Sequence, residues 1–256
     1  MGFFETVFIT HRGLVRENNE DSILIDDIII SQAQLECPAK HFVEKKRALF
    51  CVADGVGGGK SGEVASRIVL ETLSDCVMNK TELKEIEILV GRAKDELENH
   101  IIQNPEDINL ATTIAGILFD DNKATIFNTG DSRVYKLTNG YLNKLSKDHS
   151  IVESMKDAGI LDVNIKNVQN ENIITSSISG DGRTSNPEIF KSFIEIEKGD
   201  IFLICTDGLW NSIDSDSMEN AFTAPILKKT VEILLQKALT SDANDNISLI
   251  VIRCVL

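Results

Sequence analysis

The sequence has few cationic side chains for its length. It carries 26 Lys and Arg residues against 40 Asp and Glu residues, which gives a formal net charge of −14. Affinity for a nucleic-acid backbone comes mainly from clustered Lys and Arg, so this balance argues against nucleic acid as a partner. The chain also lacks any run near the roughly 18 uninterrupted apolar residues of a membrane span. We therefore expect neither nucleic-acid binding nor stable membrane insertion.

Cysteine is sparse too, and its placement argues against the usual zinc and redox motifs. The five cysteines are widely spaced without a CxxC pair, and Cys51, Cys205 and Cys254 stand inside apolar runs. Such residues are typical of small buried hydrophobes in a reducing compartment. The N-terminus has neither the basic start nor the long apolar segment of a signal peptide. These absences together predict a cytoplasmic protein.

What the chain does have is a series of five short acidic motifs spread from one end to the other. They are Arg16-Glu17-Asn18-Asn19-Glu20-Asp21, Asp54-Gly55-Val56-Gly57-Gly58, Gly130-Asp131-Ser132, Thr206-Asp207-Gly208 and Asp245-Asn246. Two of them directly follow apolar runs, residues 49–53 before Asp54 and residues 201–205 before Thr206. Carboxylates at the mouths of buried strands are unfavourable as bare charges, unless a cation or protons neutralise them. The motifs therefore predict a site for a hard metal ion.

The hydrophobic periodicity predicts strands interrupted by a central helical block. Strands are expected near residues 3–10, 22–31, 47–53, 112–119, 123–129, 133–138, 141–145, 190–196, 201–206 and 247–254. Helices are expected near residues 62–78, 82–103, 150–159, 215–222 and 226–240. Asn139-Gly140 is a strong hairpin signal, and Ser150 with Glu153 is typical of a capping box. This order favours an α+β layered fold with antiparallel sheets, in one domain over residues 1–256.

Two segments have little pattern. Residues 40–47 are charged and are expected to form an exposed loop between strands. Residues 160–188 are rich in Asn and Ser, and we expect them to be the most mobile part of the chain.

The glycine-rich stretch after Asp54 also allows a different interpretation. Residues 54–61 (DGVGGGKS) differ from the P-loop pattern GxxxxGK[ST] only at the first position, and they stand between a predicted strand and a predicted helix. The mismatch places a carboxylate beside a loop that must hold phosphate with backbone donors. A P-loop also leaves the other acidic motifs without a role. We therefore favour the metal site over a nucleoside triphosphatase.

The ordered set of motifs resembles the metal-dependent protein phosphatases of the PPM family, type 2C, and more closely its compact bacterial members. The resemblance extends over essentially the whole chain, with the pieces in the family's order. It is carried by Gly13-Leu14-Val15-Arg16, Asn19-Glu20-Asp21-Ser22, residues 54–58, Gly62-Glu63-Val64-Ala65-Ser66, Thr112-Thr113, Gly130-Asp131-Ser132-Arg133, Asp148-His149-Ser150, Thr206-Asp207-Gly208-Leu209 and Asp245-Asn246-Ile247-Ser248.

This resemblance implies a four-layer αββα sandwich, in which helices flank two antiparallel β-sheets, with a dinuclear Mg²⁺ or Mn²⁺ centre at one end. It implies that Asp54 bridges both ions and that the Gly55 carbonyl oxygen contributes to one of them. Asp207 and Asp245 would supply the remaining direct carboxylate ligands. Oxygen-only ligands suit these hard cations.

The resemblance implies supporting roles for further residues. Glu20 and Asp21 would hold waters that are bound to the ions. Asp131 together with Asp207 would form a third, weaker ion site, and Asn246 would orient the ligands.

The implied reaction is the hydrolysis of phosphoserine and phosphothreonine in proteins. A water that bridges the two ions would attack phosphorus in line, without a covalent intermediate. Arg16 would grip the phosphoryl group through its planar guanidinium, so that the expected catalytic set is Arg16, Asp54, Asp207 and Asp245. Val56 stands where the animal enzymes carry a histidine, and we assign protonation of the leaving group to metal-ordered water.

Other departures from the family pattern lie in or beside a substrate flap that we expect over approximately residues 150–188. Glu171 and Ser176 stand where relatives commonly have basic residues, while Ser179 and Ala111 replace glycines. These departures bear on substrate preference and leave the metal ligands intact. His149 precedes a helix cap, so a structural role is expected for it.

The expected partners are phosphoserine and phosphothreonine proteins and a cognate Ser/Thr kinase, with the protein itself a monomer. The alternative is a non-catalytic module of the same fold that binds a partner or senses a metal. Loss of a ligand would favour that alternative, but none of the core acidic positions is missing. The site residues therefore favour the enzyme.

Overall fold

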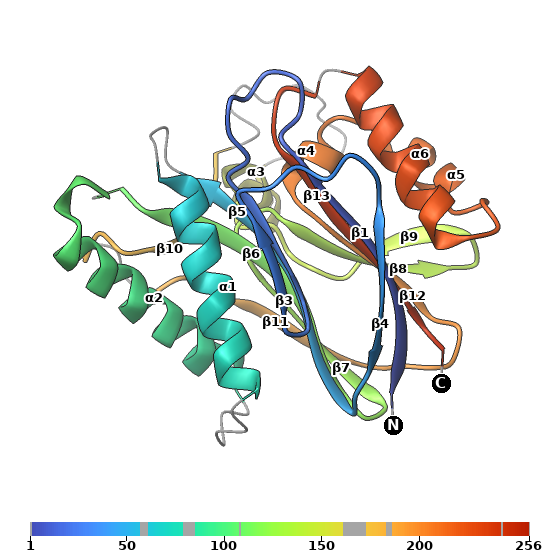
Figure 1. Cartoon of the computed structure of the whole chain (residues 1–256), viewed down its shortest axis with the longest axis horizontal. Coiled ribbons are helices and arrows are strands. Elements are labelled where there is room, and N and C mark those ends of the chain that lie inside the picture. Colours follow the sequence, from blue (N-terminus) through green and yellow to red (C-terminus); the bar gives the residue numbers. More distant parts are fainter. Residues whose placement is uncertain are drawn as a thin grey trace.

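Two antiparallel β-sheets lie face to face in the computed structural model, with helices on the outer side of each sheet (Figure 1). The structure describes residues 2–56, 61–78, 85–107, 109–160, 173–182, 186–241 and 243–255. One sheet has six strands in the order β4-β1-β13-β12-β8-β9. These strands are β1 (Phe3–His11), β4 (Ala39–Glu44), β8 (Arg133–Thr138), β9 (Tyr141–Lys144), β12 (Ile201–Cys205) and β13 (Ile247–Cys254).

The second sheet has seven strands. Its main order is β11-β7-β6-β5-β2-β3, and β10 pairs with β6 beside this path. The strands are β2 (Asp21–Ile25), β3 (Ile28–Ser31), β5 (Arg47–Val56), β6 (Ala111–Asp120), β7 (Lys123–Thr129), β10 (Ile178–Ser179) and β11 (Phe190–Glu195). Chain-adjacent strands such as β6 and β7 pair through a short turn, where Asp121 takes a positive φ of 53°.

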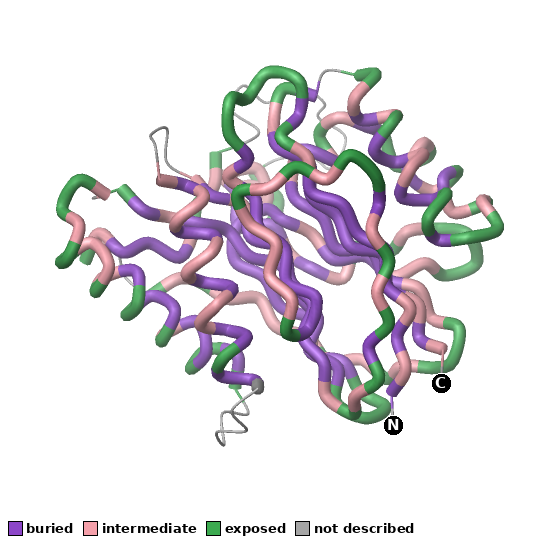
Figure 2. The backbone as a smooth tube through the Cα atoms, in the orientation of Figure 1, coloured by how far each residue is buried: buried purple, intermediate pink, exposed green. Residues whose placement is uncertain are grey.

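The space between the sheets is filled by apolar side chains from both. Phe50 and Phe119 of the seven-stranded sheet pack against Phe4 and Phe202 of the six-stranded sheet, with ring centroids 4.5–5.8 Å apart. All four side chains are buried. Figure 2 shows the central strands buried along most of their length, whereas the loops and the outer sides of the helices are exposed. This interior explains why β5, β6, β12 and β13 read as nearly continuous apolar runs.

The helices cover the two outer faces. Helices α1 (Gly62–Met78) and α2 (Ile86–Gln103) pack on the seven-stranded sheet, and Val69, Leu73 and Leu97 are among the buried residues at that face. Helices α4 (Asp207–Trp210), α5 (Ser215–Ala221) and α6 (Leu227–Thr240) pack on the other sheet. A short helix α3 (Ile151–Asp157) and a 3-10 turn η1 (Pro105–Asp107) complete the described elements. The predicted α+β sandwich is therefore confirmed.

Three details differ from the sequence-based expectation. Residues 39–44 form the edge strand β4 instead of an exposed loop. Its residues alternate between exposed positions and more buried ones, and Val43 is buried. The segment 22–31 is a hairpin of β2 and β3, since Asp26 turns the chain with a φ of 58°. The four-residue helix α4 follows β12 directly and has too few residues to show a helical period.

Part of the segment 160–188, which was predicted to be the most mobile part of the chain, forms backbone contacts with the rest of the fold. Ile174 forms a bridge with Ser150, and β10 pairs with Ala111 and Thr112 at the start of β6. Residues 161–172 and 183–185 lie outside the described ranges.

None of the helices in the described part of the chain combines the length and the apolar run that crossing a lipid bilayer requires.

Candidate metal centre

Carboxylates from both sheets meet at one end of the sandwich. Asp21 begins β2 and lies opposite Asp54 of β5 in the strand register. Asp207 follows β12 and begins α4, while Asp245 lies two residues before β13 starts at Ile247. Asp131 lies in the turn between β7 and β8. We refer to these five aspartates, Asp21, Asp54, Asp131, Asp207 and Asp245, as the acidic cluster.

In four members of the acidic cluster, Asp21, Asp54, Asp131 and Asp207, burial and repulsion between carboxylates favour the protonated form and raise the pKa. Burial and then repulsion by Asp21 and Asp207 raise the pKa of Asp54 well above its usual value. Burial, with added repulsion from Asp207, raises the pKa of Asp131 to about 7. Burial also raises the pKa of Asp21 to about 8, although hydrogen bonds from Ser248 and Thr206 oppose the shift.

The pKa of Asp207 is raised less than the pKa values of Asp21 and Asp131. Burial and repulsion by Asp245 raise its pKa to about 6, against a hydrogen bond shared with the Asp54 side chain. Two carboxyl groups can share a hydrogen bond only when one of them is protonated. A hydrogen bond between Asp54 and Asp207 therefore corresponds to a protonated carboxyl group on one of them.

Several oxygens at this end of the molecule are buried without a hydrogen-bond partner among the described residues. They are Oδ1 of Asp21, Asp131 and Asp207 and Oε2 of Glu63. A buried carboxylate oxygen without a donor carries a large desolvation cost, which a divalent cation would offset. The donor set consists of oxygen atoms, as Mg²⁺, Mn²⁺ and Ca²⁺ prefer. The residues present therefore fit a hard divalent ion.

Within the ranges that the structure describes, no three acidic, His or Cys side chains converge closely enough to enclose one ion. An ion bound here would keep part of its water shell, which is the usual behaviour of Mg²⁺ in proteins.

Glu20 and Gly55 lie together beside the start of α1. A Cβ atom placed on Gly62 would lie 2.8 Å from Glu20 Cδ and 3.0 Å from the Gly55 carbonyl oxygen. A side chain at Gly62 would therefore displace either the carboxylate or the carbonyl. Burial and then repulsion from Glu63 raise the pKa of Glu20. Glu63 lies beside Glu20 and was not predicted as a site residue, although it belongs to the motif Gly62-Glu63-Val64-Ala65-Ser66.

Arg16 reaches the acidic cluster from an exposed loop. Its Nη2 donates to Asp245 Oδ2 at 2.7 Å, and its Nε donates to the Asn244 carbonyl oxygen at 3.3 Å. The Leu14 N–H donates to the Ala243 carbonyl oxygen at 3.0 Å, which fixes the loop to the segment before β13. The Arg16 side chain remains 48% exposed, so part of its guanidinium faces solvent.

Asn246 joins the first acidic motif to the last one. Its Nδ2 donates to the carbonyl oxygens of Arg12 and Asn18, at 3.0 and 2.9 Å. Its Oδ1 accepts a hydrogen bond from the Glu20 N–H at 2.8 Å. Because Asn246 is buried, these three bonds hold the loop that carries Arg16 and Glu20 against the start of β13.

Two threonines support the aspartates and were not predicted from the sequence as site residues. Thr206 Oγ1 donates to Asp21 Oδ2 at 2.9 Å, and Thr112 Oγ1 donates to the Asp54 carbonyl oxygen at 2.8 Å. Both threonines stand inside the quoted motifs, but only the folded chain reveals their acceptors.

The structure describes two of the three residues that were predicted to form the substrate flap, and they lie in different surroundings. Ser179 is buried in β10 opposite Ala111, and Ser176 accepts a hydrogen bond from the Glu188 N–H at 2.8 Å. Glu171 lies outside the described residues. A contact between these three positions and a substrate stays a prediction.

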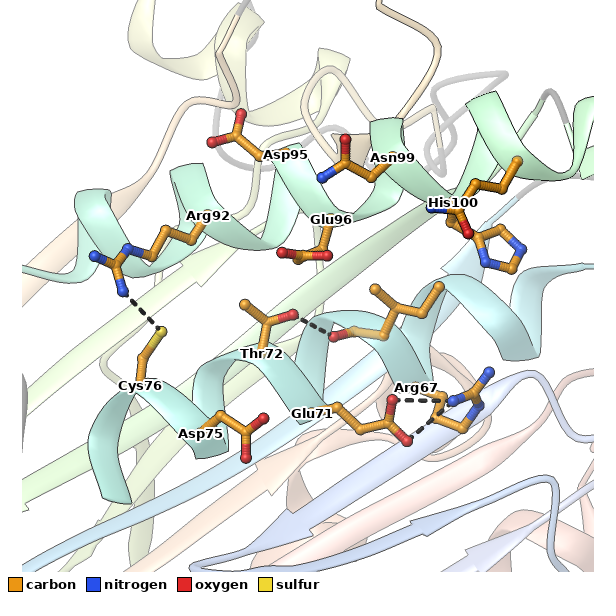
Figure 3. Close-up of a pocket in the computed structure, with 12 residues that line it drawn as sticks. Arg67, Glu71, Thr72, Asp75, Cys76, Arg92, Asp95, Glu96, Asn99 and His100 are labelled. Atoms are coloured by element: carbon orange, nitrogen blue, oxygen red, sulfur yellow. Dashed lines mark hydrogen bonds and ion pairs between the residues drawn. The ribbon is translucent and has the colours of Figure 1, made fainter. Parts of the chain in front are cut away.

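A groove between α1 and α2, on the outer face, lies away from the acidic cluster (Figure 3). Its volume is about 780 Å³. In it Arg67 pairs with Glu71, and Arg92 points toward Cys76. The groove contains none of the predicted site residues.

The P-loop interpretation fails, because every strand pair among the described residues is antiparallel, whereas a P-loop follows a strand of a parallel βαβ unit.

Comparisons with known proteins agree with this geometry. A family model described as Protein phosphatase 2C matches residues 36–246. The serine/threonine phosphatase stp of Listeria innocua is 28% identical over 256 residues, which cover 96% of this chain and 94% of that protein.

Two solved structures resemble the chain along nearly its whole length. The crystal structure of the Mycobacterium tuberculosis serine/threonine phosphatase PstP/Ppp has a TM-score of 0.81 at 25% identity and covers 99% of this chain and 100% of that one. The crystal structure of the catalytic domain of PstP in complex with 2 manganese ions has a TM-score of 0.78 at 25% identity and covers 100% of both chains.

Proposed function

Because the chain belongs to the protein phosphatase 2C family, we propose that it is a metal-dependent phosphatase of phosphoserine and phosphothreonine in proteins. The observation that carries this proposal is the acidic cluster, in which buried carboxyl groups have raised pKa values and oxygens without donors. A structural role alone does not explain such an arrangement, since clustered buried carboxyl groups destabilise a fold unless they bind protons or cations. No acidic position has been lost, so nothing favours a non-catalytic module.

Divalent cations would bind between the carboxylates of both sheets, with water completing their shells. We assign Asp54, Asp207, Asp245 and the Gly55 carbonyl oxygen as direct ligands. When bound, two Mg²⁺ or Mn²⁺ ions would supply the positive charge that lowers the pKa of water and neutralises phosphoryl oxygens.

Three more acidic residues complete the proposed site. Glu20 and Asp21 would act on the ions through water. Asp131, together with Asp207, would hold a weaker third ion. The orphaned oxygens of Asp21, Asp131 and Asp207 support these assignments.

The chain's own residues then orient the phosphoprotein. Arg16 would bind the phosphoryl group with the donors that face solvent, while Asp245 and the Asn244 carbonyl hold its guanidinium in place. Asn246 would keep the Arg16 loop at this distance. The Val56 side chain has no acidic proton to donate. The leaving serine or threonine oxygen would therefore take its proton from ordered water.

The test is hydrolysis of a phosphothreonine peptide with Mn²⁺ by the purified protein and by the variants Asp54→Asn and Asp207→Asn. Each variant removes one carboxylate charge at nearly constant volume. We expect EDTA to abolish activity and each variant to lower kcat/KM at least roughly 100-fold, because direct ligands affect the whole centre.

Asp120→Asn provides a matched control. Asp120 lies opposite Arg47 in the register of β5 and β6, seven residues along β5 from Asp54, which is roughly 23 Å at the usual strand rise. The control should keep wild-type activity. Full activity of Asp54→Asn or Asp207→Asn would refute a metal centre at the acidic cluster.

The wider setting is also proposed. The partners would be phosphoserine and phosphothreonine proteins and a Ser/Thr kinase whose action the protein reverses. A cytoplasmic location, a monomeric state and one domain over residues 1–256 remain predictions. Phosphoproteomics of cells that carry Asp207→Asn would identify the substrates, and unchanged phosphoserine and phosphothreonine levels would argue against this role.

A further inference from the structure

The turn that carries Asp131 is held by the segment that follows β9. Gly130 has a φ of 92°, and a Cβ atom there would lie 2.5 Å from the Thr113 side chain. The Gly130 N–H donates to His149 Nδ1 at 3.1 Å, and the His149 N–H donates to the Gly130 carbonyl oxygen at 2.9 Å. Asn128 Nδ2 donates to the same carbonyl oxygen at 3.2 Å. The backbone before Asp131 is therefore fixed.

The Asp131 carbonyl oxygen has a different partner, on another element. Trp210 Nε1 donates to it at 3.1 Å. Trp210 is the last residue of α4, which begins at Asp207. One indole thus connects the turn that carries Asp131 to the helical turn that carries Asp207.

The indole is itself held in place. The Arg133 guanidinium carbon lies 3.3 Å from the centre of the Trp210 ring. Arg133 donates to Asp148 through Nη2 at 2.7 Å and through Nε at 3.1 Å, and its Nη1 donates to the Tyr135 hydroxyl at 3.2 Å. Since the guanidinium is bound on three sides, the stacked ring has little freedom to rotate.

We propose that Trp210 is a positioning residue that sets the separation of the Asp131 and Asp207 carboxylates, and with it the affinity for the weakest-bound divalent ion. This inference rests on the proposed function. Both carboxylates have a buried oxygen without a donor, so their separation decides whether one ion can reach both. The pairing of β12 with β8 ends at Cys205 and Arg133, two residues from each aspartate, and the hydrogen bond from Trp210 adds a link from α4 to the Asp131 carbonyl oxygen itself.

The variant Trp210→Phe tests the hydrogen bond with little change in packing. Phenylalanine keeps an aromatic ring for Arg133 and removes the N–H donor. We expect the dissociation constant of the weakest Mn²⁺ site, measured by calorimetry on the full chain, to rise roughly three- to tenfold, as for the loss of one hydrogen bond. The Mn²⁺ concentration for half-maximal activity should rise in parallel, while KM for the phosphopeptide at saturating Mn²⁺ should stay unchanged.

Phe222→Leu is the matched packing control. Phe222 packs against the same apolar cluster as Trp210 and lies beyond α5. It should lower the melting temperature in EDTA without changing Mn²⁺ binding. Equal Mn²⁺ affinities of Trp210→Phe and the wild type would overturn the proposal.

A double-mutant cycle with Asp131→Asn separates positioning from a general loss of order. If Trp210 acts through Asp131, Trp210→Phe should change Mn²⁺ binding little further in the Asp131→Asn background. Additive losses would contradict the proposal, because they would show that the two residues act independently. Calorimetry needs no substrate, so a wild-type protein that binds Mn²⁺ but leaves phosphopeptides intact would refute the proposed function and still test this inference.

Discussion

At the scale of single residues, the acidic cluster links metal binding to protonation. Burial, reinforced by neighbouring carboxylates, raises the pKa of Asp21 to about 8, of Asp131 to about 7 and of Asp207 to about 6, from 3.8 in each case. Between about pH 4 and pH 8 the folded chain therefore binds more protons here than the unfolded chain does. The free energy of unfolding must fall as the pH rises through this window.

We therefore predict that the protein in EDTA loses stability toward urea from pH 4 to pH 8 because of these groups. Saturating Mn²⁺ should reduce the loss, since the cation replaces the protons, and Mn²⁺ affinity should weaken as the pH falls. Asp207→Asn should make the stability of the EDTA-treated protein depend less on pH, whereas Asp120→Asn should not. Wild type and Asp207→Asn with the same pH dependence would contradict the shift assigned to Asp207.

Arg16 forms a salt bridge with Asp245 of the acidic cluster and has an open side toward solvent. We predict that Arg16→Ala raises KM for a phosphopeptide roughly 10- to 100-fold, as for the loss of a charged hydrogen bond, and lowers kcat less. Arg12→Ala on the same exposed loop should leave both constants near wild type. A change in kcat alone would mean that Arg16 does not bind the phosphoryl group in the ground state.

At the scale of elements, periodicity predicted the long helices and strands well and the short pieces poorly. Helix α1 and strand β13 have the predicted bounds, because a long amphipathic or buried segment shows its period several times. Strand β10 has two residues and α4 has four, so neither completes a recognisable pattern. Both owe their form to tertiary contacts, β10 with β6 and α4 with the start of β13.

The N-terminal end of α3 was predicted correctly from the local sequence alone. Ser150 Oγ accepts a hydrogen bond from the Glu153 N–H at 3.2 Å, as its spacing predicted. Ser150→Ala should lower the free energy of unfolding by about 1 kcal/mol in urea titrations. Ser241→Ala, at the exposed C-terminal end of α6, should change it by less than about 0.5 kcal/mol. Equal effects would show that the cap contributes no stability.

At the scale of the whole molecule, the aromatic contacts between the sheets hold the two halves of the site together. Phe119 of β6 touches Phe4, Phe50 and Phe202 and is fully buried. Phe119→Ala should lower the free energy of unfolding by about 3–5 kcal/mol, measured with urea. Phe193→Ala, with a side chain that is 70% exposed, should cost less than about 0.5 kcal/mol. A small loss for Phe119→Ala would mean that the core closes around the cavity.

By itself the sequence determined the long elements, the layered fold class and the five acidic motifs, because periodicity and residue type are local properties. Only the tertiary structure decided which side chains meet: Asp21 opposite Asp54, Arg16 on Asp245, Thr206 on Asp21 and Trp210 on the Asp131 carbonyl. The separation of two residues along the sequence does not predict whether their side chains meet. Strands that are distant in sequence become neighbours because that arrangement buries the apolar faces of both sheets. The motifs therefore predict a cation, while the packing of two sheets places the carboxylates that would bind it.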